Sequence, residues 1–589
     1  MEMHPSVQQR LARLAPDQRA AATAPPGPVL CVAPAGSGKT TTLVARIAWL
    51  VASGTPPLEI CAVTFNKRAA DELGERLSAA LEPLGVAPGV VRVRTFHALG
   101  REILQAAGRA VEPLVDRGAL LRHLFPGADA ARLRQMDDGI SRLKLDRGLQ
   151  LEVVAATPGD DPTVRVFAAY EAAVRDTGGL DFDDLVARAL VLLEGSPADL
   201  ARWRAACSEL LVDEVQDVDR TQLRLATLLA APRHRIFLVG DDDQSIYGWR
   251  LADVRRVLAL DAALPGLRRI DLVTNYRCPR PVVHRAVRLI ETNQERFRKE
   301  VRAGPASEGM LVLAPDPGDG EAALRRILSA PLAEGRTRAI LARTNRELML
   351  PLALALDLSL PVRATAHLLL EEPELDGLLH EISTWGRSGT PLLLRLAKLR
   401  HVATRREPTA DREGTSPREL AAALIGWAAV HPRDDTQGFV ERIRAARDRL
   451  ATLRSDQAPL VLATAHGTKG LEFDEVAVIG LDERHFPSER ALSEAEDPVR
   501  ALEEERRLAY VAWTRARRVL TLVYDPLRPS VFLLEAFSRE ELDLPRGSGA
   551  EHLGQPPRRR ASTGVRGRRS PPGGREASAG DPPHRAVSP

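Results

Sequence analysis

The sequence predicts an α/β protein with two parallel sheets, each interrupted by a mostly helical insertion. Short apolar segments bounded by Gly, Pro or charged residues recur in two separate groups along the 589 residues. Such segments are typical of strands buried on both faces of a parallel sheet. Stretches with helical periodicity, such as 41–52 and 67–80, alternate with them. This alternation is the signature of an α/β fold.

The two groups of apolar segments predict two sheets. The expected strands of the first sheet are 29–32, 60–65, 209–213, 235–240 and 268–273, and those of the second are 339–343, 460–465, 475–480 and 519–524. Each group is interrupted by a stretch rich in Ala, Leu, Arg and Glu, a composition that favours helix. We therefore expect a first domain formed by 1–95 and 180–274 with an insertion at 96–179, and a second formed by 275–370 and 457–545 with a shortened insertion at 371–456.

The composition narrows the functional class. Four widely spaced cysteines without CxxC pairs indicate neither a disulfide framework nor a zinc site, which suits a reducing cytoplasm. No apolar run approaches ~18 residues, so we expect neither a membrane span nor a signal peptide. Residues 546–589 hold nine Arg and three acidic residues, a local charge of +6, and too few apolar residues to fold, so we expect a disordered basic tail. The remaining residues sum to −3, so any nucleic-acid surface must be a local patch.

The segment APAGSGKTT (33–41) predicts a phosphate-binding loop, because it lies between an expected strand and an expected helix. Its glycines let backbone amides close around phosphate oxygens, and the helix N-terminus adds its positive dipole end. Lys39 would reach the β- and γ-phosphates and Thr40 would bind Mg²⁺. The strict pattern has Gly at position 33, where this chain has Ala. The expected nucleotide-binding residues of this loop are Ala35, Gly36, Ser37, Gly38, Lys39, Thr40 and Thr41.

The segment LLVDEVQD (210–217) predicts the acidic partner of that loop. An apolar strand ends in Asp213, suited to hold Mg²⁺ through water, and in Glu214, suited to orient or deprotonate an attacking water. Alone, such a pair is usually a solvated strand end. Together with the phosphate-binding loop, it indicates hydrolysis of a nucleoside triphosphate.

A third segment, GDDDQSIYGWR (240–250), places two aromatic rings just beyond a cluster of carboxylates in a chain that is only 4% aromatic. With these three motifs in order, the chain resembles the UvrD/Rep-type superfamily 1 ATP-dependent DNA helicases. The resemblance covers about residues 10–540 and implies two RecA-like P-loop NTPase domains, 1A and 2A, with inserted subdomains 1B and 2B. Further matching segments are LAPDQ (14–18), AVTFNKRAADEL (62–73), RTFHALG (94–100), LDFDDL (180–185), TNYRCP (274–279), LARTN (341–345), TAHGTKGLEFD (464–474) and EEERRLAYVAWTRAR (503–517).

The resemblance implies an ATP site between the two domains. Gln18 would read the adenine, Tyr276 would stack on it, and Glu472 would hydrogen-bond the ribose. Gln244 would contact the γ-phosphate, with Arg277 and Arg515 reaching it from the second domain. Cations are needed there because phosphoryl transfer spreads charge over the equatorial oxygens. A surface salt bridge is the alternative for each arginine taken singly.

The resemblance also implies a track for single-stranded DNA. Tyr247 and Trp249 would stack on bases, and core packing is the alternative for such rings. Trp249 lies five positions after Gln244, at most ~17 Å of extended chain, so one loop can touch both nucleotide and DNA. The other DNA contacts expected from the matching motifs are Thr64, Phe65, Phe96, His97, Arg250 and His466.

The leading functional expectation is an ATP-dependent helicase moving 3′→5′ on single-stranded DNA and ss/ds junctions, in DNA repair or replication. We expect a cytoplasmic, nucleoid-associated bacterial protein that is a monomer or a DNA-induced dimer, with repair-complex proteins as further partners. Only about 120 residues separate LARTN from TAHGTKG, so 2B is abbreviated. That favours an alternative: a DNA-stimulated ATPase that strips proteins from DNA with little unwinding, or the motor subunit of a larger complex. An RNA-directed motor fits the motifs less well.

Overall fold

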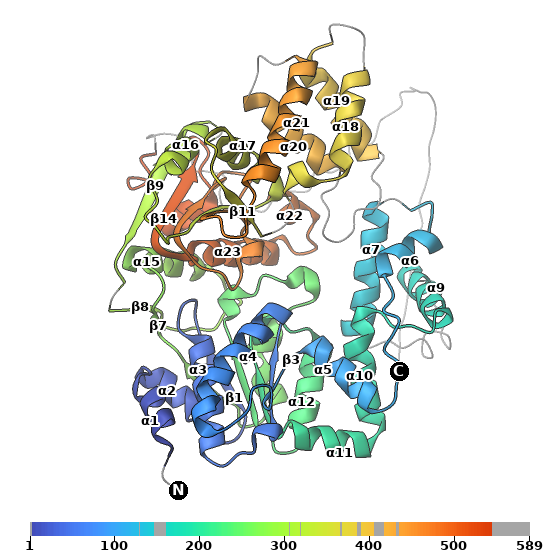
Figure 1. Ribbon diagram of the computed structural model, residues 1–589, viewed down its shortest axis with the longest axis vertical. Helices are drawn as coiled ribbons and strands as arrows, with labels where there is room; N and C mark the ends of the chain where they lie inside the picture. The colour runs from blue at the N-terminus through green and yellow to red at the C-terminus, as the bar shows by residue number, and fades with distance from the viewer. Residues whose placement is uncertain are drawn as a thin grey trace, which may run out of the picture. The chain divides into compact units, whose positions relative to one another are not determined.

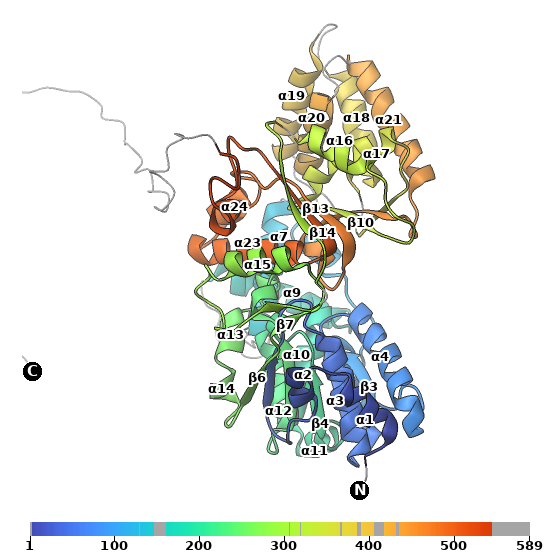
Figure 2. The same ribbon diagram turned by 90° about the vertical axis from the view of Figure 1, so that its left-hand side faces the viewer.

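The computed structural model describes residues 3–544, except for 129, 147–160, 306, 319, 366–367, 386–389, 406–416 and 431–434. The expected basic tail, 546–589, lies outside the described residues. Two six-stranded sheets, in which every strand pairing is parallel, organise the described chain (Figures 1 and 2). The predicted fold class is confirmed.

The first sheet has the strand order β3-β2-β4-β5-β1-β6. The five predicted strands are all present. The sixth, β3, has the sequence RVRT and lies at the sheet edge with all four residues only half-buried, so it lacks the apolar run that marked the others. The bounds are β1 Val29–Val32, β2 Ile60–Thr64, β3 Arg92–Thr95, β4 Glu209–Val212, β5 Ile236–Gly240 and β6 Arg268–Asp271.

Helices cover both faces of the first sheet. Because successive strand residues point to opposite faces, each strand contributes side chains to two cores. Cys31 of β1 packs in a core with α3 and α4, whereas Leu30 packs in a second core with α5, α10 and α12. Figure 1 shows α3 and α4 on one side of this sheet and α10 and α12 on the other. The bounds are α1 Pro5–Ala12, α2 Pro16–Ala22, α3 Lys39–Ala52, α4 Lys67–Leu81, α5 Phe96–Ala106, α10 Phe182–Gly195, α11 Pro197–Ala206, α12 Arg220–Ala230, α13 Val254–Leu258 and α14 Leu260–Ala263.

The expected insertion at 96–179 is helical where it is described. Its first helix, α5, packs against α10 in the core of the first sheet. The helices that follow form a small core of their own, with Leu121, Ile140 and Phe167 among its members. They are α6 Arg117–Leu124, α7 Ala130–Ser141, a π-helical turn Arg142–Asp146 and α9 Pro162–Asp176.

The second sheet has the strand order β11-β12-β10-β13-β14-β9. The four predicted strands are β10, β12, β13 and β14. The two strands that sequence reasoning missed are the sheet's edges: β11 is only three residues long, and β9 is partly solvent-exposed. The bounds are β9 Met310–Pro315, β10 Arg338–Ala342, β11 Val362–Ala364, β12 Leu460–Thr464, β13 Phe473–Val478 and β14 Ala516–Tyr524, with a two-residue pair, β7 Thr274–Asn275 and β8 Arg302–Ala303, outside both sheets.

Helices also cover both faces of the second sheet. One core joins the sheet to α15, α23 and α24, and the other joins it to α16, α17 and the helices of 371–456. Those helices, α18 to α21, lie beside α16 and α17 in Figure 2 and share one continuous core with them. The bounds are α15 Arg280–Ile290, α16 Glu321–Ser329, α17 Met349–Asp357, α18 Glu374–Thr384, α19 Leu392–Arg405, α20 Pro417–Val430, α21 Thr436–Leu453, α22 Glu489–Glu494, α23 Pro498–Trp513 and α24 Val531–Ala536.

Two further observations concern the chain as a whole. All four cysteines are buried and unpaired with one another. Among the described residues, no helix combines the length and apolar character needed to cross a membrane.

Candidate nucleotide and DNA site

Three motif segments meet at one edge of the first sheet. The phosphate-binding loop follows β1, Asp213 and Glu214 follow β4, and the turn beginning at Asp241 follows β5. The strands β4, β5 and β1 are neighbours in the sheet and parallel. Their carboxyl ends therefore lie side by side, which is where open α/β sheets bind ligands.

The phosphate-binding loop depends on glycine at two positions. Gly36 and Gly38 have φ values of 68° and 84°, in the left-handed region that side chains rarely adopt. A Cβ at Gly36 would lie 2.7 Å from the Cβ of Arg277, and a Cβ at Gly38 would lie 2.6 Å from Nε2 of Gln18. Gln18 Nε2 donates a hydrogen bond of 2.8 Å to the Ser37 carbonyl. The loop backbone is thus in close contact with two of the predicted site residues.

The donors of this loop fit a nucleotide phosphate. The Ser37 hydroxyl is buried and has no hydrogen-bond partner among the described residues. Lys39 begins α3, and its Nζ lies 3.0 Å from Glu214 Oε2. A phosphate oxygen would satisfy the Ser37 hydroxyl and offer Lys39 a second anionic partner. Thr40 follows Lys39 on the first turn of α3, where its hydroxyl could serve a metal ion.

The adjacent carboxylates Asp213 and Glu214 differ in protonation. Burial, reinforced by the charge of Glu214, raises the pKa of Asp213 to about 7. Burial also acts on Glu214, but Lys39 and Lys469 outweigh it and lower the pKa of Glu214 to about 2. Glu214 has a φ of 52°, a strained conformation of the kind that concentrates at functional sites. At neutral pH the residue expected to orient water is therefore ionised.

The arginines of the second sheet domain reach this edge. Arg515, just beyond α23, is 1% exposed, and its Nη2 donates a hydrogen bond of 3.1 Å to Oε1 of Gln244. Burial lowers the pKa of Arg515 to about 9. Arg277 donates to Glu472 at 2.6 Å and to the Thr514 carbonyl at 3.2 Å. Arg515 is thus in contact with Gln244, and Arg277 lies against the phosphate-binding loop at Gly36.

The segment around Tyr276 is held against the phosphate-binding loop. The Tyr276 amide donates to the Gly36 carbonyl at 2.9 Å, while its side chain leaves the residue 48% exposed. Asn275, which sequence reasoning missed, caps this turn: its Oδ1 accepts from the amides of Arg277 and Cys278 at 2.8 Å each. The signal that could have identified Asn275 was its position in the motif segment TNYRCP, directly before Tyr276 and Arg277. Glu472, expected at the ribose, is engaged here by Arg277 and Arg517.

The turn after β5 carries an aromatic track at its far end. Tyr247 stacks on Phe65, with ring centroids 5.0 Å apart and an interplanar angle of 17°. Trp249 meets Tyr247 edge-on at 6.0 Å and is 57% exposed. The Arg250 guanidinium lies 4.6 Å from the centroid of the Trp249 ring. A partly exposed set of rings beside a cation is a suitable surface for stacking bases.

Two expected DNA contacts require correction. Phe96 is 2% exposed and belongs to the core between α5 and the first sheet, so its ring is not available to a base. Thr64 is fully buried, and its hydroxyl donates to the Asn66 carbonyl at 3.1 Å. Both residues border half-buried motif positions, but the side-chain direction of a strand end or helix start is set by packing.

The two expected histidines lie in different settings. His97 stacks on Phe182 at 4.0 Å, and Phe182 is 57% exposed. Phe182 is a surface ring that sequence reasoning missed, although LDFDDL contains it. His466 lies on the turn after β12. Burial lowers the pKa of His97 to about 4 and that of His466 to about 3.

Two motif residues have distinct settings. Thr41 is exposed on the first turn of α3. Leu251 has a φ of 66°, a conformation that costs a non-glycine residue about 1–2 kcal/mol. The turn that ends the aromatic track is therefore kept at some cost in backbone strain.

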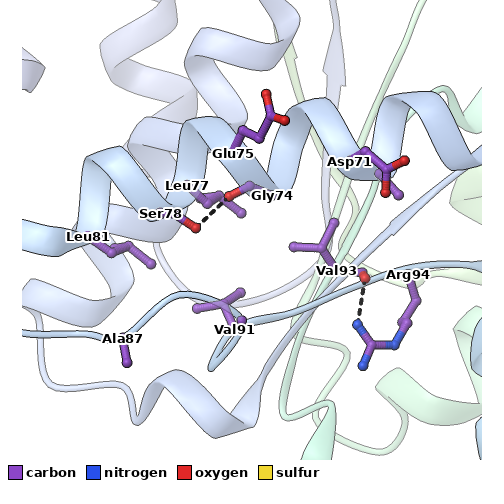
Figure 3. A pocket seen from close by; sticks show the side chains of 12 residues that line it. Asp71, Gly74, Glu75, Leu77, Ser78, Leu81, Ala87, Val91, Val93 and Arg94 are labelled. Carbon is purple, nitrogen blue, oxygen red and sulfur yellow. Dashed lines mark hydrogen bonds between the residues drawn. The ribbon is translucent and has the colours of Figure 1, made fainter.

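A surface pocket of about 540 Å³ lies between α4 and residues 87–94, and Ala70, Asp71 and Arg94 of two motif segments are in its lining (Figure 3). Leu77, Val91 and Arg94 are among its lining residues, and Arg94 donates to the Val93 carbonyl. None of the twelve residues that line it is a predicted site residue. It does not belong to the nucleotide site.

Two parallel α/β domains, with a phosphate-binding loop in the first and arginines supplied by the second, define a two-domain P-loop NTPase. Comparison with known families narrows this class. The family model of the UvrD/REP helicase N-terminal domain matches residues 14–265, and that of the UvrD-like helicase C-terminal domain matches residues 426–526. The chain belongs to the UvrD/Rep helicase family and is a helicase enzyme.

Individual relatives agree over most of their length. DNA helicase II of Escherichia coli (strain K12) is 30% identical over 618 residues, covering 87% of this chain and 84% of the relative. The ATP-dependent DNA helicase Rep of the same organism is 28% identical, covering 89% and 94%. The ATP-dependent DNA helicase PcrA of Leuconostoc citreum is 27% identical, covering 87% and 80%.

Proposed function

We propose that this protein is an ATP-dependent DNA helicase that hydrolyses ATP to move 3′→5′ along single-stranded DNA and to separate strands. The observation that carries the proposal is the turn after β5. At one end Gln244 contacts Arg515 beside the phosphate-binding loop, and at the other Tyr247 and Trp249 present stacked rings. Stacking of bases on aromatic side chains contributes about 1–3 kcal/mol per base and tolerates any sequence, as a translocating motor requires.

In this proposal the first domain holds ATP and aims the water. The backbone of the phosphate-binding loop, Ser37 and Lys39 bind the phosphates, with Gln18 at the adenine and Tyr276, from the second domain, stacked on it. Mg²⁺ would neutralise phosphate charge when bound, and Thr40 and Asp213 are the residues that would hold it. Glu214, ionised at neutral pH, would orient the attacking water.

The second domain would complete the site. Arg277 and Arg515 would stabilise the charge that develops on the transferred phosphoryl group. Because both arginines come from beyond β6, closure of the two domains around ATP would accompany catalysis. Arg515 contacts Gln244, so a shift of the second domain acts directly on the turn that carries Tyr247 and Trp249.

We assign the parts of the chain to the family's subdomains on the same basis. Residues 1–95 and 180–274 would form 1A, 96–179 would form 1B, 275–370 and 457–545 would form 2A, and 371–456 would form a shortened 2B. The sheet composition and the separate core of α6, α7 and α9 support this division. A role in bacterial DNA repair or replication, action at ss/ds junctions, and a monomer or DNA-induced dimer complete the proposal.

The first test is steady-state ATP hydrolysis by the full chain, with and without single-stranded DNA. We expect strong stimulation by DNA that disappears in Lys39→Ala, and unwinding of duplexes with a 3′ but not a 5′ overhang. An ATPase that ignores DNA would overturn the role of the turn after β5. Unwinding only from 5′ overhangs would overturn the direction.

A second candidate is a translocase that strips proteins from DNA, or a motor subunit, with little unwinding of its own. It is favoured by the helices α18 to α21, which share one core with the second sheet. A segment packed in this way is suited to stabilise the second domain more than to act as a separate duplex-binding element. Displacement of streptavidin from biotinylated single strands, without strand separation, would favour this candidate.

A further inference from the structure

The strongest feature that the proposed site leaves unused is a buried cation behind the turn after β5. Lys299, which lies between α15 and β8, has a side chain only 1% exposed. It forms ion pairs with all three aspartates of the GDDDQ motif: at 2.8 Å with Asp241, at 2.9 Å with Asp243, and also with Asp242. Burying a charge in this way is tolerated only when it is paired, and here the partners lie in the motif that ends in Gln244.

The chain around Lys299 reinforces this contact. Arg296 binds both oxygens of Asp243, at 2.9 and 2.8 Å, and the Phe297 amide donates to Asp242 at 2.8 Å. Residues 293–299, called the bridging segment below, therefore contact every carboxylate of the motif. All three carboxylates are fully buried.

One of these carboxylates orients Gln244. Asp241 accepts from Lys299 on Oδ1 at 2.8 Å and from Gln244 Nε2 on Oδ2 at 2.6 Å. The other end of the Gln244 amide accepts from Arg515 Nη2 at 3.1 Å. A carboxylate can only accept and a guanidinium can only donate, so these two neighbours fix which way the amide faces.

The bridging segment is also attached to α23, the helix that precedes Arg515. Glu503 accepts from the amides of Gln294 and Glu295, at 2.7 and 3.2 Å. Arg507 donates to the Glu295 carbonyl at 2.6 Å. A movement of α23 therefore acts on the segment that carries Lys299, as well as on Arg515 itself.

We propose that Lys299 is a positioning residue for ATP hydrolysis: by holding Asp241, it aims Gln244 at Arg515 and the γ-phosphate. This inference rests on the proposed function, because it concerns the rate of that reaction. Within the described part of the chain, the hydrogen bonds and ion pairs of Lys299 go to the three aspartates and none goes to the phosphate-binding loop. Loss of Lys299 should therefore lower kcat and leave the binding of ATP nearly unchanged.

The test compares two buried lysines in the full-length protein. Lys299→Met removes the charge and keeps the length of the side chain. Lys144→Met is the matched control, because Lys144 is 3% exposed and also pairs with three carboxylates, but these are Glu171, Asp181 and Asp184, away from Gln244. Both substitutions leave buried carboxylates without their cation, so both should lower the melting temperature.

We expect DNA-stimulated kcat to fall about 10- to 100-fold in Lys299→Met, with KM for ATP changed by no more than about twofold. Lys144→Met should retain kcat at temperatures where it is folded. Asp241→Asn, which keeps Lys299 and removes one negative charge from the cluster, should reproduce the loss of kcat. If Lys299→Met is unfolded by circular dichroism, Asp241→Asn decides the question.

An unchanged kcat in Lys299→Met would overturn the inference; if that variant is unfolded, an unchanged kcat in Asp241→Asn would do so. The inference would also be overturned if Lys144→Met lost as much kcat, or if only KM for ATP changed. The wild-type protein and Lys39→Ala, measured alongside, separate this result from the proposed function. If the wild type hydrolyses no ATP in the presence of DNA, the proposed function fails and the inference fails with it. If the wild type is stimulated and the Lys299 variant matches it, only the inference fails.

Discussion

Lys39 Nζ lies 3.0 Å from Glu214 Oε2, so the cation expected to bind phosphate is paired with the carboxylate expected to orient water. The Gln216 side chain donates to the same carboxylate oxygen at 2.5 Å. A nucleotide phosphate would compete with Glu214 for Lys39. Binding of ATP and release of the general base would thereby be linked events.

The first prediction concerns this pair. Glu214→Gln should lower ATP hydrolysis about 10²- to 10⁴-fold, because the group that positions the water is lost. The affinity for ATP should be unchanged or tighter, because Lys39 loses an anionic competitor. Fluorescent-nucleotide titration and single-turnover hydrolysis measure the two effects separately, with Glu494→Gln on the exposed α22 as control. Hydrolysis at the wild-type rate would exclude Glu214 from this role.

The second prediction concerns the arginine of the second domain. Arg515→Ala should reduce kcat about 10³-fold, the lower range for a transition-state arginine. Arg515→Lys should restore little, because an ammonium cannot reproduce the planar set of donors that bonds Gln244, Leu471 and Val511. Arg518→Ala, which removes a largely exposed side chain of β14, is the control. Equal kcat values for Arg515→Ala and the control would contradict the prediction.

The third prediction separates a surface ring from a core ring. Trp249→Ala should weaken binding of single-stranded DNA by about 1–3 kcal/mol, because its 57% exposed ring is offered to a base. Phe96→Ala should instead lower the free energy of unfolding by about 3–5 kcal/mol, because its ring is 2% exposed in the core. Fluorescence anisotropy with labelled oligothymidylate and urea denaturation distinguish the two. A Phe96 variant that is stable but binds DNA weakly would restore the original expectation for this residue.

The fourth prediction concerns pH. Burial holds the pKa of His97 near 4 and that of His466 near 3, below the ordinary value of 6.5. As the pH is lowered from about 6.5 toward these lowered pKa values, the two histidines bind protons in the unfolded chain but not in the folded one. The free energy of unfolding therefore falls through this window. The contribution is fully present above about pH 6.5. Urea denaturation at pH 7 and pH 5 should show a smaller difference in a His97→Gln/His466→Gln variant than in the wild type. An identical difference would exclude the two histidines as the cause.

Sequence reasoning recovered the elements whose signals are local. The strands β1, β4 and β5 are apolar runs that end in motif residues, so the strands themselves and the motifs at their ends could be read directly. The edge strands β3, β9 and β11 were missed because an edge strand is partly solvated and need not be apolar. Phe96 and Thr64 were misplaced because a motif shows which residues are adjacent in the chain, while packing decides which of them faces solvent.

Lys299 marks the limit of that reasoning. The chain has only six lysines, and four of them, Lys39, Lys144, Lys299 and Lys469, have side chains that are 15% exposed or less and lie in ion pairs. The scarcity of lysine was a usable signal for a special role. It could not identify the partners, because Lys299 is 58 residues from Asp241 and no local pattern connects them.

The sequence by itself determined the fold class, the phosphate-binding loop, the acidic pair and the family, because each depends on residue types at short, fixed spacing. The tertiary structure alone decided which of those side chains meet. The contacts of Arg515 with Gln244, of Lys39 with Glu214 and of Lys299 with Asp241 span 271, 175 and 58 residues of chain. Contacts of that kind arise from the order of strands in a sheet and the packing of one domain on the next, which short-range spacing does not specify.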